Sequence, residues 1–141
     1  MQVDFYQLSR DPIERVVPLL AAKATEGGAR LLVVHGDAAA RAPLSDALWA
    51  REGAFLANGE DHAARQPILL SATCAASNGA AIAILADGEW REEAAGFERA
   101  ILLFGPEQTE TARALWGTLT GNGHALRIFK QGESGGWREG R

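Results

Sequence analysis

Arg30-Leu31-Leu32-Val33-Val34-His35 is the stretch of sequence that decides the fold class. A nearly continuous apolar run of this length is typical of a strand in the middle of a sheet that is covered on both faces. The preceding segment, from Ile13 to Gly27-Gly28, repeats apolar residues at helical spacing, and Val3–Leu8 before it is a short apolar strand candidate. The chain therefore opens in the order strand, helix, strand.

The same alternation continues toward the C-terminus. A second helix is expected to begin near Pro43, because a proline breaks or kinks a helix that runs through it. Gly105-Pro106-Glu107 predicts the start of a last helix, which runs to about Thr120. The remaining strand candidates are Pro67–Ser71, Ala80–Ala86, Glu98–Phe104 and His124–Lys130. Strands that alternate with helices predict a three-layer α/β sandwich with a mainly parallel central sheet.

Length and composition indicate one domain. The 141 residues are 47% hydrophobic, and a chain of this size buries a core without disulfides. We expect a single α/β domain over residues 1–131 and a polar, glycine-rich, flexible tail over residues 132–141. One cysteine and three scattered histidines offer neither a disulfide framework nor metal-ligand spacing, so no metal is expected. The sequence has no long apolar run and no signal-like N-terminus, which makes the cytoplasm the expected location and a membrane an unexpected partner.

Charge is distributed unevenly along the sequence. The formal net charge is −4, which disfavours a protein whose main task is to bind duplex DNA through its phosphates. Residues 1–110 carry 9 Lys and Arg against 16 Asp and Glu, whereas residues 111–141 carry 5 against 2. A basic C-terminal segment on an acidic body indicates a local site for an anionic partner. A segment that is basic by chance is the alternative.

The sequence carries no nucleotide-binding or catalytic motif. It has no phosphate loop, and the turn from Gln7 to Pro12 has no glycine to bring backbone amides to a pyrophosphate. Cys74 stands among alanines with no local base, which is typical of an inert thiol. We therefore expect no catalytic residue and no cofactor. The alternative is a small-molecule or nucleotide-binding protein with a site at the sheet edge near His35 and Gly36.

The first candidate site for a protein partner is aromatic. Trp49 lies on the flank of the second helix, and the loop after that helix carries Phe55 and Leu56. These three residues form either an exposed apolar patch, which is the usual mark of a protein interface, or a part of the core into which the loop folds back.

The second candidate site lies on the last helix. Trp116 belongs both to the core stripe of this helix and to its shoulder, where Arg113 stands beside it. An arginine next to a half-exposed aromatic fits a peptide that ends in a carboxylate and an apolar side chain; a solvated surface arginine is the alternative. Arg127 and Lys130, in the same basic segment, are candidates to assist Arg113.

At these residues the sequence resembles the chi subunit family of bacterial DNA polymerase III. The most specific piece is the block Leu44-Ser45-Asp46-Ala47-Leu48-Trp49 followed by Phe55-Leu56. Weaker pieces are spread over nearly the whole chain: Phe5-Tyr6-x-Leu8, Lys23 before Gly27-Gly28, Leu31–Val34, Ala112-Arg113 and Gly123. The resemblance implies a Rossmann-like fold without nucleotide chemistry, in a non-enzymatic replisome adaptor that shares in DNA polymerase activity only by association.

The resemblance also implies two partners. One is the acidic C-terminal tail of single-stranded DNA-binding protein, which would bind at Arg113 and Trp116; the positive charge of Arg127 and Lys130 makes them expected helpers at this site. The other is a clamp-loader subunit, psi or a substitute, or a helicase, which would face Trp49, Phe55 and Leu56. Two stretches depart from the family pattern: Ala57-Asn58 replaces a frequent Pro-His, and Leu115-Trp116-Gly117-Thr118 replaces an aromatic and basic run.

Overall fold

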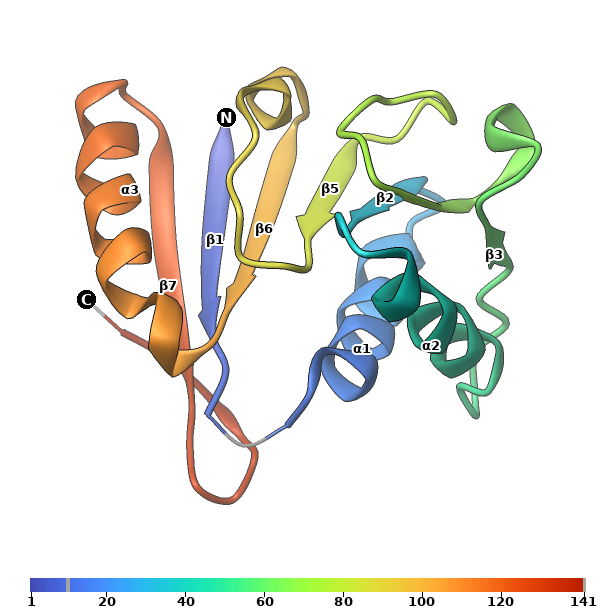
Figure 1. The fold of residues 1–141 in the computed structure, drawn as a ribbon, viewed down its shortest axis with the longest axis horizontal. Coiled ribbons are helices and arrows are strands. Elements are labelled where there is room, and N and C mark those ends of the chain that lie inside the picture. Colours follow the sequence, from blue (N-terminus) through green and yellow to red (C-terminus); the bar gives the residue numbers. More distant parts are fainter. Residues whose placement is uncertain (10, 141) are drawn as a thin grey trace.

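A computed structural model describes residues 1–9 and 11–140. They form three layers, with one sheet in the middle and helices on both of its faces (Figure 1). The strands follow the order β3-β4-β2-β5-β6-β1-β7-β8, and every neighbouring pair is parallel except β7 and β8. The strands are β1 (Gln2–Gln7), β2 (Leu31–Val34), β3 (Asn58–Gly59), β4 (Ile68–Ser71), β5 (Ile82–Leu85), β6 (Arg99–Phe104), β7 (Ala125–Gln131) and β8 (Trp137–Glu139). The helices are α1 (Ile13–Thr25), α2 (Ala38–Trp49) and α3 (Thr109–Gly121), with short 3₁₀ turns η1 (Ala63–Arg65), η2 (Glu92–Gly96) and η3 (Pro106–Gln108). The mainly parallel α/β sandwich predicted from the sequence is confirmed.

The apolar run that decided the fold class is an internal strand. All four residues of β2 are fully buried, and β2 pairs in parallel with β4 on one side and β5 on the other. Continuous apolar residues are required here because both faces of the strand are covered. The two strand candidates that follow it in the sequence are therefore its two neighbours in the sheet.

Each face of the sheet has its own core. Phe5 of β1 belongs to the cluster that packs under α3, whereas the next residue, Tyr6, belongs to the cluster that packs under α1 and α2. This alternation follows from the two-residue period of a strand. On β7 it places Ile128 on the α3 face and Phe129 on the other. Figure 1 shows α3 alongside β7 near one edge of the sheet and α1 and α2 near the other.

The start of α2 differs from the prediction. The helix begins at Ala38, and Pro43 lies inside it. The carboxylate of Asp37 accepts a hydrogen bond from the backbone N–H of Ala39 at 2.9 Å, which caps the helix at this earlier point. The three alanines of the first turn have high helix propensity. Leu44 and Leu48 are fully buried and pack the helix against the sheet. Capping and burial together outweigh the one hydrogen bond that the proline lacks.

The C-terminal segment also differs from the prediction. Within the stretch expected to be a flexible tail, Trp137–Glu139 form β8, which pairs antiparallel with β7. Gly135, at φ +90°, makes the turn of this hairpin, and the N–H of Gly132 donates to the carbonyl of Gly136 at 2.7 Å. The Trp137 ring packs edge-on against Tyr6 with centroids 5.1 Å apart, which anchors the hairpin to the core. Arg141 lies outside the described residues.

The length and composition of a helix decide whether it can cross a membrane. The longest helices of the described residues, α1 and α3, have 13 residues each. No helix among residues 1–9 and 11–140 combines the length and the apolar composition needed to cross a bilayer.

Candidate functional site

A cleft of about 290 Å³ lies between α3 and β7, and we call it the α3–β7 cleft. Phe5, Phe104, Trp116 and Ile128 supply its apolar lining. Phe5 is buried and packs edge to face against Trp116, with ring centroids 5.2 Å apart, and against Phe104, with centroids 6.3 Å apart. These rings come from two neighbouring strands, β1 and β6, and from α3 above them, so the floor of the cleft is rigid.

Two cations stand on the cleft's rim. Arg113 lies three residues before Trp116 on α3, and Lys130 lies near the end of β7. Both are exposed, and within the described residues neither side chain makes a hydrogen bond or an ion pair. No carboxylate of the described chain lines the cleft. Free cations beside an apolar recess suit a ligand that combines an anionic group with an apolar one.

Arg127 does not belong to this cleft, which corrects its assignment from the sequence. It alternates with Ile128 along β7 and therefore faces the other side of the sheet. There its Nε donates to Oδ1 of Asp4 at 3.1 Å, and its guanidinium lies 5.3 Å from the centre of the Phe129 ring. Arg127 therefore holds the sheet together.

Asp4 is the buried centre of that ion cluster. Its side chain is fully buried and also accepts a hydrogen bond from Nε of Arg99 at 2.8 Å. Burial raises the pKa of Asp4, but hydrogen bonds from Arg127, Gln2 and Arg99 outweigh it and hold the pKa below its ordinary value. The carboxylate is therefore ionised, and it ties β1 to β6 and β7.

The Trp49–Phe55 surface is the second candidate site. Trp49 is 52% exposed and Phe55 is 83% exposed, and their rings make an edge contact with centroids 5.7 Å apart. Leu56 is only 4% exposed and belongs to the core under α1 and α2, so it is not part of the patch. Trp49 and Phe55 therefore form the exposed patch, whereas Leu56 is the part of the loop that folds back into the core. Two large exposed aromatic rings in contact are typical of a protein interface.

A buried polar anchor shapes the loop that carries Phe55. Asn58 is buried, and its side-chain amide donates to the carbonyl of Leu56 at 2.8 Å. The hydroxyl of Ser45 on α2 donates to Oδ1 of Asn58 at 2.6 Å. These two hydrogen bonds hold the loop so that Leu56 points into the core and Phe55 points to solvent, where its ring contacts Trp49. The sequence does not predict this anchor, because a polar pair 13 residues apart has no periodic signal.

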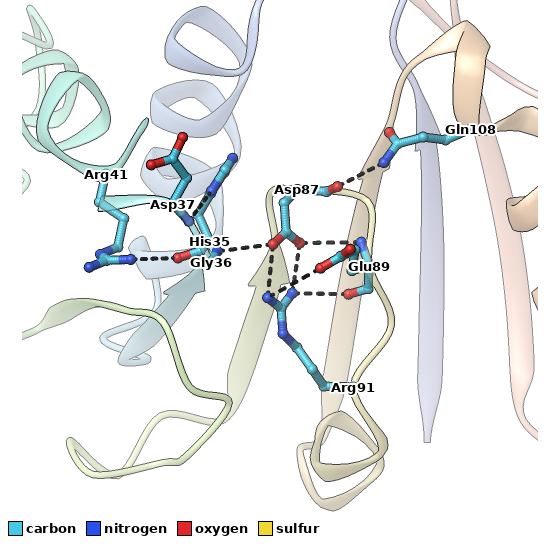
Figure 2. A network of polar contacts seen from close by, with 8 residues as sticks. All are labelled: His35, Gly36, Asp37, Arg41, Asp87, Glu89, Arg91 and Gln108. Atoms are coloured by element: carbon cyan, nitrogen blue, oxygen red, sulfur yellow. Dashed lines mark hydrogen bonds and ion pairs between the residues drawn. The ribbon is translucent and has the colours of Figure 1, made fainter. Parts of the chain in front are cut away.

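The sheet edge near His35 was the alternative site, and its polar groups bind one another (Figure 2). The carboxylate of Asp87 accepts from the backbone N–H of Gly36 at 3.0 Å and from both terminal nitrogens of Arg91 at 2.6 and 2.8 Å. The N–H of Asp37 donates to Nδ1 of His35 at 3.1 Å. The backbone N–H groups of Gly36 and Asp37 are thus already paired within the chain.

Charge also disfavours a nucleotide there. Burial raises the pKa of Asp87, but hydrogen bonds from Arg91, Gly36 and Glu89 outweigh it and lower the pKa below its ordinary value. A phosphate approaching the start of α2 would meet the carboxylates of Asp37 and Asp87 where it needs N–H donors.

Cys74 is also unsuited to nucleophilic chemistry. The thiol is buried, and burial, with a smaller contribution from Glu93, raises its pKa. A protonated, buried thiol is a poor nucleophile.

Fold and site together define a Rossmann-like α/β protein that carries an amphipathic cleft and an exposed aromatic surface and has no phosphate loop. The chain belongs to the family described as DNA polymerase III chi subunit, HolC, whose model matches residues 1–127. A search of the curated proteins found no match. The family resemblance seen in the sequence is confirmed, and the protein has an accessory role in DNA replication. The matched part ends within β7, before Ile128, Lys130 and β8.

Proposed function

We propose that this protein is a non-enzymatic adaptor of the replisome. One partner is the acidic C-terminal tail of single-stranded DNA-binding protein, which binds in the α3–β7 cleft. The other is a clamp-loader subunit, psi or a substitute, or a helicase, which binds the Trp49–Phe55 surface. Family membership supports the replication role, and the two surfaces support a protein with two partners.

The observation that carries this proposal is the composition of the cleft. Phe5, Trp116 and Ile128 offer an apolar recess, and Arg113 on its rim is a cation without a partner in the described chain. A peptide that ends in an aromatic residue carries its last side chain and its terminal carboxylate on the same atom. The ring then enters the recess while the carboxylate accepts hydrogen bonds from the Arg113 guanidinium.

The positions of the two surfaces support simultaneous binding. α3 lies beside β7 near one edge of the sheet, whereas α2, which carries Trp49, lies near the other edge (Figure 1). The sheet separates them, with its own hydrophobic core on each face. A peptide in the cleft therefore leaves the Trp49–Phe55 surface free for a second protein.

A bridging experiment tests the adaptor function. Each arm is first measured alone, as binding of the protein to the acidic tail peptide and to the cognate clamp-loader complex or helicase. The peptide is then immobilised, the protein is added, and capture of the second partner is measured. We expect capture with the wild type, loss of the peptide arm in Arg113→Ala, and loss of only the second arm in Trp49→Ala. Arg65→Ala, an exposed arginine on η1, is the matched control. Loss of both arms in one folded variant, or no capture by the wild type, would contradict the proposal.

A further inference from the structure

Two cations stand opposite each other on the C-terminal hairpin. In the β7–β8 register Lys130 pairs with Arg138, and both side chains are exposed. Residues directly opposite in an antiparallel pair project from the same face of the sheet, so Arg138 lies on the face of Lys130. Because Lys130 lines the α3–β7 cleft, Arg138 extends the cleft's positive rim one strand further out.

Gly140 gives independent evidence for this arrangement. A Cβ at Gly140 would lie 3.3 Å from Cγ2 of Ile128 and 3.6 Å from Cε of Lys130. The α3 face of β8 therefore continues the floor that Ile128 begins, and the Lys130 side chain lies along it. Since side chains two residues apart on a strand share a face, Arg138 and Gly140 belong to the same surface.

This arrangement costs stability in the free protein. Like charges directly opposite across a strand pair repel each other. Within residues 1–9 and 11–140, neither Lys130 nor Arg138 makes an ion pair that would offset the repulsion. The nearest acidic residues of the hairpin do not change this: Glu139 pairs with Phe129 on the opposite face, and Glu133 lies in the turn. Two unpaired like charges in opposite positions are unfavourable for folding, and such features are expected where a ligand binds.

We propose that Lys130 and Arg138 bind the acidic side chains that precede the terminal residue of the peptide in the α3–β7 cleft. This inference rests on the proposed function and adds the direction in which the peptide leaves the cleft. On the helix side the chain carries Glu107 and Glu110, which repel an acidic peptide. On the strand side Lys130 and Arg138 attract it, so the peptide crosses β7 and β8. Arg138 lies outside the part of the chain that the family model matches.

Peptide titrations with two ligands test the proposal. The first ligand is an acidic peptide that ends in Phe, and the second carries Asn and Gln in place of its internal acids but keeps the terminal carboxylate. Arg138→Ala is expected to weaken binding of the acidic peptide about twofold to fivefold, the range for exposed ion pairs, and to leave the second peptide unaffected. Arg138→Glu is expected to weaken binding of the acidic peptide further. Arg65→Glu makes the same change of charge at η1, close to the opposite edge of the sheet, and is expected to leave both affinities unchanged.

Stability gives a second readout. Because each substitution removes the repulsion of Lys130, we expect Arg138→Ala and Arg138→Glu to melt at the wild-type temperature or above it. A variant that gains stability but loses affinity for the acidic peptide alone supports the proposal. Equal affinities in Arg138→Glu and Arg65→Glu overturn it.

Two further outcomes separate the proposals. If Arg113→Ala loses the peptide while the Arg138 variants bind normally, only this inference fails. If the wild type binds neither peptide, the proposed function fails with it. An oligodeoxythymidylate that binds more tightly than the peptide and is lost in Arg138→Glu would assign the two cations to nucleic acid and overturn the assignment made here.

Discussion

Phe5 of β1 and Trp116 of α3 pack edge to face, with ring centroids 5.2 Å apart and an interplanar angle of 62°. This contact joins the first strand of the chain to its last helix, and it forms the floor of the α3–β7 cleft. The recess is therefore a continuation of the hydrophobic core. A site built on packed elements is ready for its ligand before the ligand arrives, which lowers the entropic cost of binding.

Truncation of Trp49 is expected to affect partner binding, whereas truncation of Leu56 is expected to affect stability. Trp49→Ala removes a half-exposed ring, so we expect a folded protein that loses ~2 kcal/mol or more of binding to its second partner. Leu56→Ala opens a cavity in the core, so we expect a loss of about 2 to 5 kcal/mol of unfolding free energy. Denaturant unfolding and partner capture measure the two effects. If Trp49→Ala unfolds, the ring belongs to the core and the Trp49–Phe55 surface is not an interface.

The ion cluster around Asp4 is expected to make stability depend on pH in acid. Its folded pKa lies below its ordinary value, so its stabilisation is complete above about pH 4 and is lost as the pH falls through the folded pKa. Asp4→Asn is expected to cost about 1.5 to 3 kcal/mol at pH 7, the scale of hydrogen bonds to a charged group.

The difference in unfolding free energy between wild type and Asp4→Asn isolates this contribution, because Asp87 also has a lowered pKa and acts in the same direction in both proteins. We expect the difference to shrink as the pH falls below about 4. A difference that stays constant down to pH 2 would show that the charge of Asp4 is not what stabilises the sheet.

Nucleotides are expected to leave stability unchanged. A ligand at 100 times its Kd stabilises a protein by about 2.7 kcal/mol, which a melting curve resolves easily. The carboxylates of Asp37 and Asp87 stand where a phosphate would need donors, so neither ATP nor NAD should raise the melting temperature, and ATP should not be hydrolysed. A clear rise with either nucleotide would favour the site near His35 instead.

The sequence predicts the elements whose signal is local and strong. Leu31–Val34 form an internal strand because four adjacent aliphatic residues suit a strand that is buried on both faces. Pro106 opens the short 3₁₀ turn η3, and the last helix, α3, follows it from Thr109. The start of α2 was misplaced because the Asp37 cap and the burial of Leu44 outweigh a proline. The sequence does not predict β8, because three residues between glycines have no periodicity; pairing with β7 and the packing of Trp137 on Tyr6 hold them.

The candidate cleft was predicted in part. Arg113 and Trp116 were found from helical spacing, and Lys130 joins them. Arg127 was grouped with them by its charge, although the two-residue period of a strand separates it from Lys130 and Ile128. Phe5 and Phe104 had no such signal, because parallel pairing between segments almost a hundred residues apart brings them together.

The measurement that tests the account most directly is a titration of a fluorescent acidic peptide ending in Phe against wild type, Arg113→Ala and the control Arg65→Ala. We expect wild-type affinity to fall with added salt without vanishing, because screening weakens the ion pairs and leaves the ring in its recess. Arg113→Ala should remain folded and lose about 1.5 to 3 kcal/mol of binding free energy. Equal affinities of the wild type and the folded Arg113→Ala protein would contradict the assignment of the α3–β7 cleft as the peptide site.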